Sequence, residues 1–443
     1  MDMQILYEDN HLLIAVKPVN IPSQGDPSGD ADMLTLLKAY IKEKYNKPGE
    51  VYLGLVHRLD RPAGGVMAFA RTSKAAARLS AQFAGHGAKK RYLAVLCGEG
   101  NGGSFADYIR KEANGTAILC DEGAAEAKAA RLSYAPLAYT EGLTLADVSL
   151  QTGRHHQIRV QMAGHGLPLW GDQRYNPAAK PGQQLALWAY SLTIEHPTLH
   201  RPLTFTALPQ GGVWDTPGFQ SAMAAASAGF GLVYSDANVL AVDKPSGLPT
   251  AEADGGPDTL EARLKALYGT AYPLHRLDAN TTGLVLFART EQARDELLSA
   301  FEKRRVHKTY HCVVKGVPSS KEAFCTAYLQ KDAQKARVTV FDSPRPGAKE
   351  IQTAYRMLAS KGGESLLAVD LYTGRTHQIR AHLAHLGHPL LGDDKYGDRD
   401  WNRARKVCLP RLCAVELSFS LPATSPLAYL NELRLTAQPP WIF

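Results

Sequence analysis

One eighteen-residue stretch occurs twice in this chain, and the repetition constrains the fold more than any other feature of the sequence. Residues 55–72 read LVHRLDRPAGGVMAFART, and residues 273–290 read PLHRLDANTTGLVLFART. The two stretches align without a gap and agree at nine positions, which are the HRLD run, one glycine and the FART run. Repeats of this kind are identified first, because a missed repeat changes the interpretation of the whole fold.

Three further pairs of segments follow in the same order. They are KKRYLAVL (89–96) with HKTYHCVV (307–314), TGRHHQIR (152–159) with TGRTHQIR (373–380), and GLPLWGDQRY (166–175) with GHPLLGDDKY (387–396). The spacing is kept, since Asp278 lies 218 residues after Asp60 and Arg380 lies 221 residues after Arg159. A period near 220 residues is too long for a solenoid and indicates two whole domains in tandem.

The join between the copies is expected in PQGGVWDTPGFQSAMAAASAG (209–229), which is rich in Gly, Ala, Ser and Pro. We therefore expect a first domain over residues 1–215, a linker over 216–230 and a second domain over 231–443. A chain of 443 residues is also too long for one ordinary hydrophobic core, so two domains agree with its length.

Within each copy, the pattern alternates between strand and helix. Short apolar runs that end at proline, LLIAVKP (12–18) and VLAVDKP (239–245), predict strands, and GGVMAFA (64–70) and GLVLFA (283–288) predict central strands buried on both faces. Thr72 and Thr290 stand where N-caps are expected before two amphipathic helices. The predicted fold is α+β, with a largely antiparallel sheet in each of the two tandem domains.

Composition narrows the class of protein. Hydrophobic residues make up 45% and charged residues 21% of the chain, which is typical of globular proteins. The acidic start MDMQILYEDN contains no apolar run of the length of a signal peptide, so a cytoplasmic location without membrane attachment is expected. The six cysteines form no CxxC pair and are interpreted as reduced thiols. The net charge of +7 is compatible with a nucleic-acid partner.

Asp60 and Asp278 are the first candidate catalytic residues. Each ends the HRLD run just before a predicted central strand, and a loop at the edge of a rigid strand is a usual place for a reactive group. A lone aspartate there is more often a turn cap. Here the HRL before the aspartate is identical in both copies while the loop after it diverges, and this favours a catalytic role.

Tyr92 and Tyr310 close a Lys-x-Tyr triplet at the start of a predicted strand, where an aromatic ring either packs over the sheet or offers a face on which a base can stack. Arg159 and Arg380 end the HQIR runs, which we interpret as strands. Such an arginine either faces solvent or pairs with a buried carboxylate, and a paired aspartate stays ionised, as a nucleophile requires.

No metal or cofactor is expected. The spacing of His382, His385 and His388 is like that of metal-binding histidines. The first copy, however, has Gln161, Gly164 and Leu167 in their places. We therefore interpret them as ordinary helix and turn histidines. The sequence also contains no Walker loop, no GxGxxG after a strand and no HExxH.

Taken together, HRLD with its glycine and apolar strand, Lys-x-Tyr, TGRxHQIR and GxPLxGDxxY resemble the RluA family of RNA pseudouridine synthases, over almost the whole chain. The resemblance implies an enzyme that isomerises uridine in RNA by detaching uracil from C1′, rotating it and reattaching it through C5, without cofactor or metal. It also implies a catalytic role for the aspartates, for the tyrosines, which lie against the base and are implicated in proton removal at C5, and for the paired arginines. These residues are Asp60, Asp278, Tyr92, Tyr310, Arg159 and Arg380.

The HRLD arginines are expected to fill the space left by an extruded nucleotide, which cannot be reached inside a helix. The expected substrate-binding residues are Arg58, Arg276, His57, His275, Arg154 and Arg375. The partner is RNA, either ribosomal or transfer RNA, and no obligate protein partner is expected. Two working sites are favoured over one working site with an RNA-holding copy, and over an RNA-binding protein without catalysis. Attack by the aspartate on C1′, attack on the ring and stabilisation of positive charge at C1′ stay open.

Overall fold

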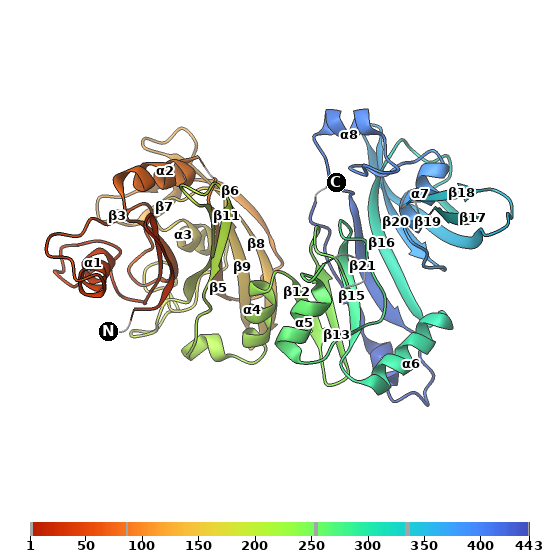
Figure 1. Cartoon of the computed structure of the whole chain (residues 1–443), viewed down its shortest axis with the longest axis horizontal. Helices are drawn as coiled ribbons and strands as arrows, with labels where there is room; N and C mark the ends of the chain where they lie inside the picture. Colours follow the sequence, from red (N-terminus) through yellow and green to blue (C-terminus); the bar gives the residue numbers. More distant parts are fainter. Residues whose placement is uncertain (1–2, 86, 252–255, 333–336, 442) are drawn as a thin grey trace. The chain divides into compact units, whose positions relative to one another are not determined.

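The computed structural model describes the whole chain except residues 1–2, 86, 252–255, 333–336 and 442 (Figure 1). The chain divides into two compact units, Met1–Ser227 and Ala228–Phe443, and each unit carries one copy of the repeat. Part of the segment 216–230 forms helix α4 (Phe219–Ser227), whose Phe219 and Met223 are buried against Leu93 and Val95 of the first unit. The domain limits drawn from the sequence stay predictions.

The first unit contains, in its described residues, one 11-stranded sheet with the order β1-β2-β4-β10-β5-β9-β8-β6-β7, to which β3 and β11 add at β4 and β10. The strands are β1 (Ile5–Glu8), β2 (Leu12–Lys17), β3 (Gly54–Leu55), β4 (Gly64–Ala70), β5 (Lys89–Cys97), β6 (Gly103–Lys111), β7 (Ala117–Cys120), β8 (Lys128–Thr140), β9 (Leu143–Leu150), β10 (Leu187–Glu195) and β11 (Pro202–Thr206). The helices besides α4 are α1 (Met33–Lys44), α2 (Ser73–Ala84), α3 (Gln157–Gly164) and the short η1 (Gly212–Asp215).

The second unit repeats this topology with the order β12-β13-β15-β21-β16-β20-β19-β17-β18, and β14 and β22 add at β15 and β21. The strands are β12 (Gly231–Ser235), β13 (Val239–Lys244), β14 (Tyr272–Pro273), β15 (Thr282–Ala288), β16 (Val306–Lys315), β17 (Glu322–Asp332), β18 (Arg337–Phe341), β19 (Lys349–Lys361), β20 (Glu364–Leu371), β21 (Leu412–Phe419) and β22 (Arg434–Thr436). The helices are α5 (Leu260–Tyr268), α6 (Glu291–Glu302), α7 (Gln378–His385), α8 (Arg399–Arg405) and the short η3 (Ala428–Glu432).

The sheets are mixed but largely antiparallel, which confirms the predicted α+β class. The described pairings are antiparallel except those of β4 with β10 and of β15 with β21. Strands β4 and β15 are buried along their whole length, as their continuous apolar sequences predict. Helices α2 and α6 begin after Thr72 and Thr290, whose side chains accept from the backbone N–H of Ala75 and Ala293.

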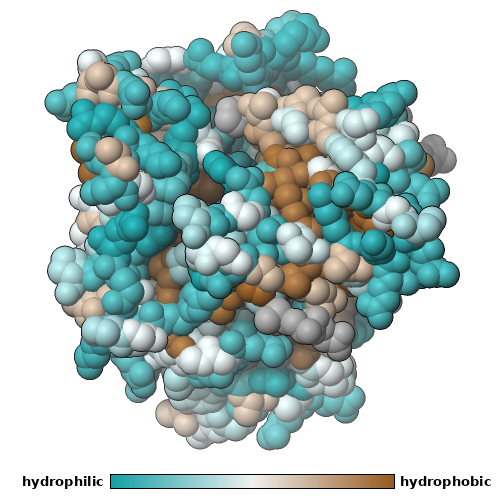
Figure 2. Space-filling view, turned by 90° about the vertical axis from the view of Figure 1, so that its left-hand side faces the viewer, coloured by the Kyte–Doolittle hydropathy of each residue, from teal (hydrophilic) through white to brown (hydrophobic). Residues whose placement is uncertain are grey.

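Not all apolar residues are covered. On the face drawn in Figure 2, hydrophobic residues gather in a recess that hydrophilic residues border. An exposed apolar fraction is normal for a folded protein, so this view alone identifies no site. Among the described residues, no helix combines the length and the apolar character that a membrane span needs.

A glycine is required where each central strand meets its parallel neighbour. Gly65 in β4 has φ +123°, and a Cβ built there would lie 2.2 Å from the carbonyl oxygen of Ala189 in β10. Gly283 in β15 has φ +103° and meets the Ala414 oxygen at the same distance. Both strands therefore pass so close to their neighbour that no side chain fits.

We predict that Gly65→Ala lowers the free energy of unfolding by more than about 2 kcal/mol, because the methyl group has to displace backbone of a buried strand. Gly182→Ala is the matched control, since Gly182 also has a positive φ of +84° but has no atom within 4 Å of the added Cβ. Chemical denaturation of the full chain measures both changes. Equal losses for the two variants would show that backbone conformation, rather than the close approach, makes Gly65 necessary.

Candidate active site

The loop that carries Asp60 is held on both sides of the residue. The hydroxyl of Ser23 donates to the Leu59 carbonyl at 2.8 Å and accepts from the Leu59 N–H at 3.1 Å. The ammonium of Lys17, which is fully buried, donates to the carbonyls of Arg61 at 3.0 Å and Ala63 at 2.6 Å. Burial lowers the pKa of Lys17 to about 7, although the charge of Asp60 acts in the opposite direction. Asp60 thus stands on a rigid loop, and 24% of its side chain stays exposed.

Arg159 lies on a helix, so the strand predicted for HQIR was wrong. Helix α3 starts at Gln157 after His156, which has the left-handed φ of +52°. Ile158 and Met162, four residues apart, both enter the hydrophobic core of the first unit, and this i, i+4 spacing is the helical pattern that a four-residue motif is too short to reveal. The same correction holds for Arg380 in α7, which starts after His377 at φ +54°.

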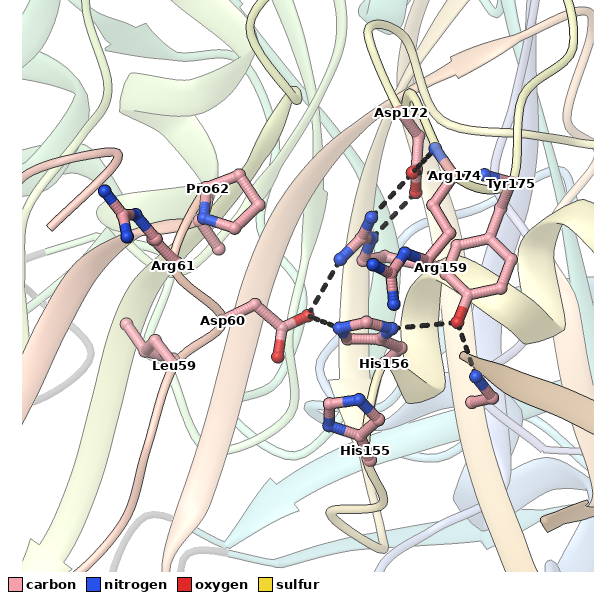
Figure 3. A network of polar contacts seen from close by, with 12 residues as sticks. Leu59, Asp60, Arg61, Pro62, His155, His156, Arg159, Asp172, Arg174 and Tyr175 are labelled. Atoms are coloured by element: carbon pink, nitrogen blue, oxygen red, sulfur yellow. Dashed lines mark hydrogen bonds and ion pairs between the residues drawn. The ribbon is translucent and has the colours of Figure 1, made fainter. Parts of the chain in front are cut away.

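The guanidinium of Arg159 binds two aspartates at once (Figure 3). Its Nε and Nη2 donate to the two carboxylate oxygens of Asp172 at 2.8 and 2.7 Å, and its Nη1 donates to Oδ2 of Asp60 at 3.4 Å. Burial on its own would lower the pKa of Arg159, but the hydrogen bonds and charge of Asp172, together with the charge of Asp60, raise it. The arginine is therefore a permanent positive partner for Asp60, positioned by the fully buried Asp172.

Tyr92 lies on β5 with 8% of its surface exposed. Burial first, and the negative charge of Asp60 second, raise the pKa of its phenol. The phenol is therefore protonated at neutral pH. Tyr310 on β16 is 5% exposed, and burial and the charge of Asp278 raise its pKa in the same way.

His156 approaches the same carboxylate oxygen of Asp60 as Arg159 does. Its Nε2 is 3.8 Å from Oδ2 of Asp60, and its Nδ1 is 2.8 Å from the hydroxyl oxygen of Tyr175, which accepts from the Ala117 N–H at 2.8 Å. Burial lowers the pKa of His156 to about 4, although Asp60 opposes the shift, so the ring is neutral at neutral pH. Figure 3 shows this chain of contacts from Asp60 through His156 to Tyr175.

The second unit repeats the arrangement. Arg380 donates to both oxygens of Asp393 at 2.7 and 2.8 Å and to Oδ2 of Asp278 at 2.9 Å. His377 lies 3.8 Å from Asp278 and 2.8 Å from the Tyr396 hydroxyl. Two copies that differ in the loop after the aspartate thus keep the same polar partners, although the arginine is closer to Asp278 (2.9 Å) than to Asp60 (3.4 Å).

The residues expected to bind substrate lie in different settings. Arg58 and Arg276 are exposed, and so are Arg154 and Arg375 in the loops before α3 and α7. His57 and His275 instead accept backbone N–H groups, from Ala68 at 3.0 Å and Leu286 at 3.2 Å respectively. The ring of His57 also stacks on Phe83 with a centroid distance of 4.3 Å. These two histidines therefore brace the HRLD segment against the sheet.

Sequence reasoning missed the aspartates that hold the arginines and the tyrosines that hold the histidines. Asp172, Tyr175, Asp393 and Tyr396 all belong to the GxPLxGDxxY motif, which is present in both copies. Repetition, the criterion that selected Asp60 and Tyr92, would have selected them too. The buried Lys17 and its counterpart Lys244, both 0% exposed, precede the prolines that were taken only as strand ends.

The triad of histidines in the second copy does not converge. His382 contacts the Thr353 hydroxyl at 3.0 Å, His385 contacts Asp342 at 2.7 Å and His388 contacts the Lys315 carbonyl at 3.1 Å. Among the described residues, the grouping whose ligand atoms could surround one metal ion is Asp60 with His155 and His156, in the first unit.

A partly exposed carboxylate on a rigid loop, paired to a buried arginine and close enough to a buried phenol to raise the pKa of that phenol, is compatible with a class of enzyme in which an aspartate reacts directly with the substrate. Comparison with known families agrees with this class. The sequence profile of the family described as RNA pseudouridylate synthase matches residues 11–164 and 238–385, one segment in each unit. The chain belongs to the RNA pseudouridylate synthase family.

Several curated proteins are similar to this chain. An uncharacterized RNA pseudouridine synthase of Chloroflexus aurantiacus is 39% identical over 35% of this chain and 51% of its own length. The ribosomal large subunit pseudouridine synthase D of Pseudomonas aeruginosa is 36% identical over 38% of this chain and 53% of its own length. The alignments span about half the length of these relatives.

One solved structure, human RNA pseudouridylate synthase domain containing 4, is 22% identical and aligns with a TM-score of 0.41, covering 50% of this chain and 91% of its own.

We predict that stability falls as pH is lowered below the ordinary histidine pKa of 6.5, partly because of His57. Burial, with the charge of Lys90, lowers its pKa to about 3, so the unfolded state binds the extra proton between these values. The contribution of His57 to the free energy of unfolding is present above about pH 6.5 and is lost as pH falls toward 3. The loss is at most about 1.4 kcal/mol per pH unit, and it is smaller because the ring is partly exposed to water.

His57→Gln keeps an acceptor for the Ala68 N–H and removes the titration, so it should flatten this slope. Urea denaturation at about pH 7, 6 and 5 measures the slope. His200→Gln makes the same substitution at an exposed histidine and is the matched control. An unchanged slope in His57→Gln would show that folding does not shift the pKa of His57.

Proposed function

We propose that this protein isomerises uridine to pseudouridine in structured RNA, with one active site in each unit. The observation that carries the proposal is the Asp–Arg–Asp arrangement, which recurs in both units with the same partners. Ribosomal RNA is the preferred substrate class, because several relatives are named ribosomal large subunit pseudouridine synthases. Transfer RNA is the second candidate, since nothing in the site geometry discriminates between the two.

In this proposal, the target uridine leaves its stack and binds beside Asp60, at a cost of a few kcal/mol. The exposed Arg58, one residue from the rigid Leu59–Asp60 backbone, is suited to enter the space that the nucleotide leaves. Asp60 then acts on C1′ or on the uracil ring. Arg159 holds the reacting carboxylate in one orientation, because its own position is fixed by the bidentate contact to Asp172.

Tyr92 is proposed to act late in the reaction, when the proton at C5 has to leave. Its phenol is protonated in the free enzyme, partly because the charge of Asp60 disfavours a second negative charge nearby. Any step that consumes the carboxylate charge, such as formation of a covalent bond from Asp60, would lower the pKa of Tyr92. Loss of the Asp60 charge would therefore activate the phenol in part, after the aspartate has reacted, while burial continues to raise its pKa.

Two other hypotheses compete with two working sites. One unit could hold RNA while the other reacts, but the contacts of Asp278 match those of Asp60, and an idle copy has no chemical reason to keep them. An RNA-binding protein without catalysis would have no use for carboxylates in an RNA site, because a carboxylate repels phosphate and weakens binding.

We predict that Asp60→Asn and Asp278→Asn, made singly in the full chain, each abolish a different subset of modified uridines. Asparagine keeps the shape of aspartate but lacks its negative charge and its nucleophilic oxygen. The rates of pseudouridine formation at the affected uridines should therefore fall on the order of 10³-fold or more. Tritium release from unmodified ribosomal and transfer RNA transcripts labelled at uridine C5 measures the rates. Site mapping of pseudouridine in the products assigns each loss.

Asp121→Asn, at an exposed aspartate, is the control and should retain full activity. Loss of activity in only one of the two single variants would favour the hypothesis of one working unit. Unmodified uridine in every RNA offered to the wild-type chain would favour RNA binding without catalysis.

We predict that Tyr92→Phe stops the reaction of the first unit before tritium is released, while uracil detachment still occurs. Phenylalanine keeps the buried ring and removes only the hydroxyl, so the unfolding midpoint should stay near that of the wild type. Rapid-quench analysis of RNA bound to the variant would show an accumulated adduct or altered nucleotide. Tritium release at the wild-type rate would show that a group other than Tyr92 takes the proton.

A further inference from the structure

The two sites differ at one residue beside the reacting aspartate. The first copy reads TGRHHQIR and the second reads TGRTHQIR, so His155 in the first unit corresponds to Thr376 in the second. Both residues are exposed. In Figure 3 the ring of His155 lies next to that of His156 on the side of Asp60, and the two rings stack with a centroid distance of 3.8 Å and an interplanar angle of 25°.

We propose that Asp60, His155 and His156 form a binding site for a transition-metal ion of the Zn²⁺ type in the first unit, and that the second unit lacks this site because Thr376 replaces the histidine. The three ligand atoms lie within 4.8 Å of one another, and the Nε2 of His156 is 3.8 Å from Oδ2 of Asp60. In a tetrahedral zinc site with bonds of about 2.0–2.1 Å, neighbouring ligand atoms are roughly 3.3 Å apart. Metal binding would therefore require a small approach of Asp60 to His156 as well as a small rotation of the exposed His155 side chain.

The hydrogen bonds of both rings leave one nitrogen of each for a metal. Nε2 of His155 is 2.9 Å from the Gly115 carbonyl, and a carbonyl only accepts, so Nε2 carries the hydrogen and Nδ1 keeps its lone pair. The Tyr175 hydroxyl can accept from Nδ1 of His156 as well as from the Ala117 N–H, and in that tautomer Nε2 keeps its lone pair toward Asp60. Metal-binding histidines usually have such a partner on the second ring nitrogen, because it fixes the ring orientation.

The ligand set selects the class of ion. Two imidazole nitrogens and one carboxylate oxygen suit Zn²⁺, Co²⁺, Ni²⁺ and Cu²⁺, whereas Mg²⁺ and Ca²⁺ prefer oxygen ligands only. The guanidinium of Arg159, 3.4 Å from Asp60, opposes a second cation, but its charge is balanced by Asp172, to which it makes two short hydrogen bonds. Three protein ligands leave a coordination position open for water or for an oxygen of a bound RNA.

A metal bound here would occupy the carboxylate that the proposed reaction needs. Zinc would therefore inhibit the first unit and spare the second, where His377 and Asp278 stand 3.8 Å apart and the described residues offer no third ligand. This inhibition rests on the proposed function, but the binding of the metal does not. The binding is therefore tested with the metal alone.

The test uses the full chain with Zn²⁺ or Co²⁺ as the probe. Calorimetry counts zinc sites, and the visible absorption of bound Co²⁺ reports a site of nitrogen and oxygen ligands, distinct from the intense near-ultraviolet absorption of cysteine-bound cobalt. His155→Thr copies the second unit into the first and should remove one such site, with at least about a 10- to 100-fold loss of affinity, since even an outer-shell partner is worth that much. Thr376→His, the reciprocal variant, should create a second site of the same kind.

Both substitutions are at exposed positions, so unfolding midpoints near that of the wild type are expected and would show that binding changes are local. Equal cobalt absorption and zinc affinity in the wild type and in His155→Thr would overturn the proposal. In the RNA assay, zinc should suppress only the uridines lost in Asp60→Asn, and His155→Thr should be resistant. Metal binding that depends on His155 in a chain without activity on any RNA would support this site while refuting the proposed function.

Discussion

The ion pair between a buried arginine and two aspartates is the interaction on which each site depends. A guanidinium that is nearly buried, as Arg159 and Arg380 are, is costly unless carboxylates pair with it in good geometry. Asp172 and Asp393, both 0% exposed, satisfy two of its donors, and the third points at the partly exposed Asp60 or Asp278. The fixed pair therefore determines where the second aspartate finds its positive partner.

This arrangement makes each unit self-contained. The loop that carries the aspartate is fixed by a lysine at the end of one strand, by a hydroxyl of Ser23 or Thr250, and by the arginine of a short helix. All of these groups come from the same unit as the aspartate they hold. A duplication of the whole domain consequently duplicates this arrangement without requiring any new contact.

The sequence predicted the duplication, the strands, the capped helices and the candidate aspartates because these leave local patterns that a second copy makes visible. It failed on the helix that carries Arg159, since four residues cannot distinguish a helical from an extended period. It also could not show that His57 and His275 accept backbone N–H groups, because this depends on the orientation of each imidazole ring. Nor could it show that His155 approaches Asp60, because this depends on the packing of two segments nearly a hundred residues apart.

Differences between the units show which parts of the domain are free to change. In the first unit, Trp188 of β10 lies opposite Gly64 of β4, and a Cβ on that glycine would come within 2.2 Å of the indole ring.

In the second unit, Cys413 of β21 lies opposite Thr282 of β15. In the first unit a large side chain lies opposite a glycine, and in the second unit two smaller side chains share the same space. A change of only one residue of such a pair would therefore produce a clash or a void. The parallel pairing beside the site has been kept through this exchange, while the glycine next to it, Gly65 or Gly283, has not changed. The backbone that positions the aspartates is thus the conserved quantity, and the side chains around it have diverged in coupled pairs.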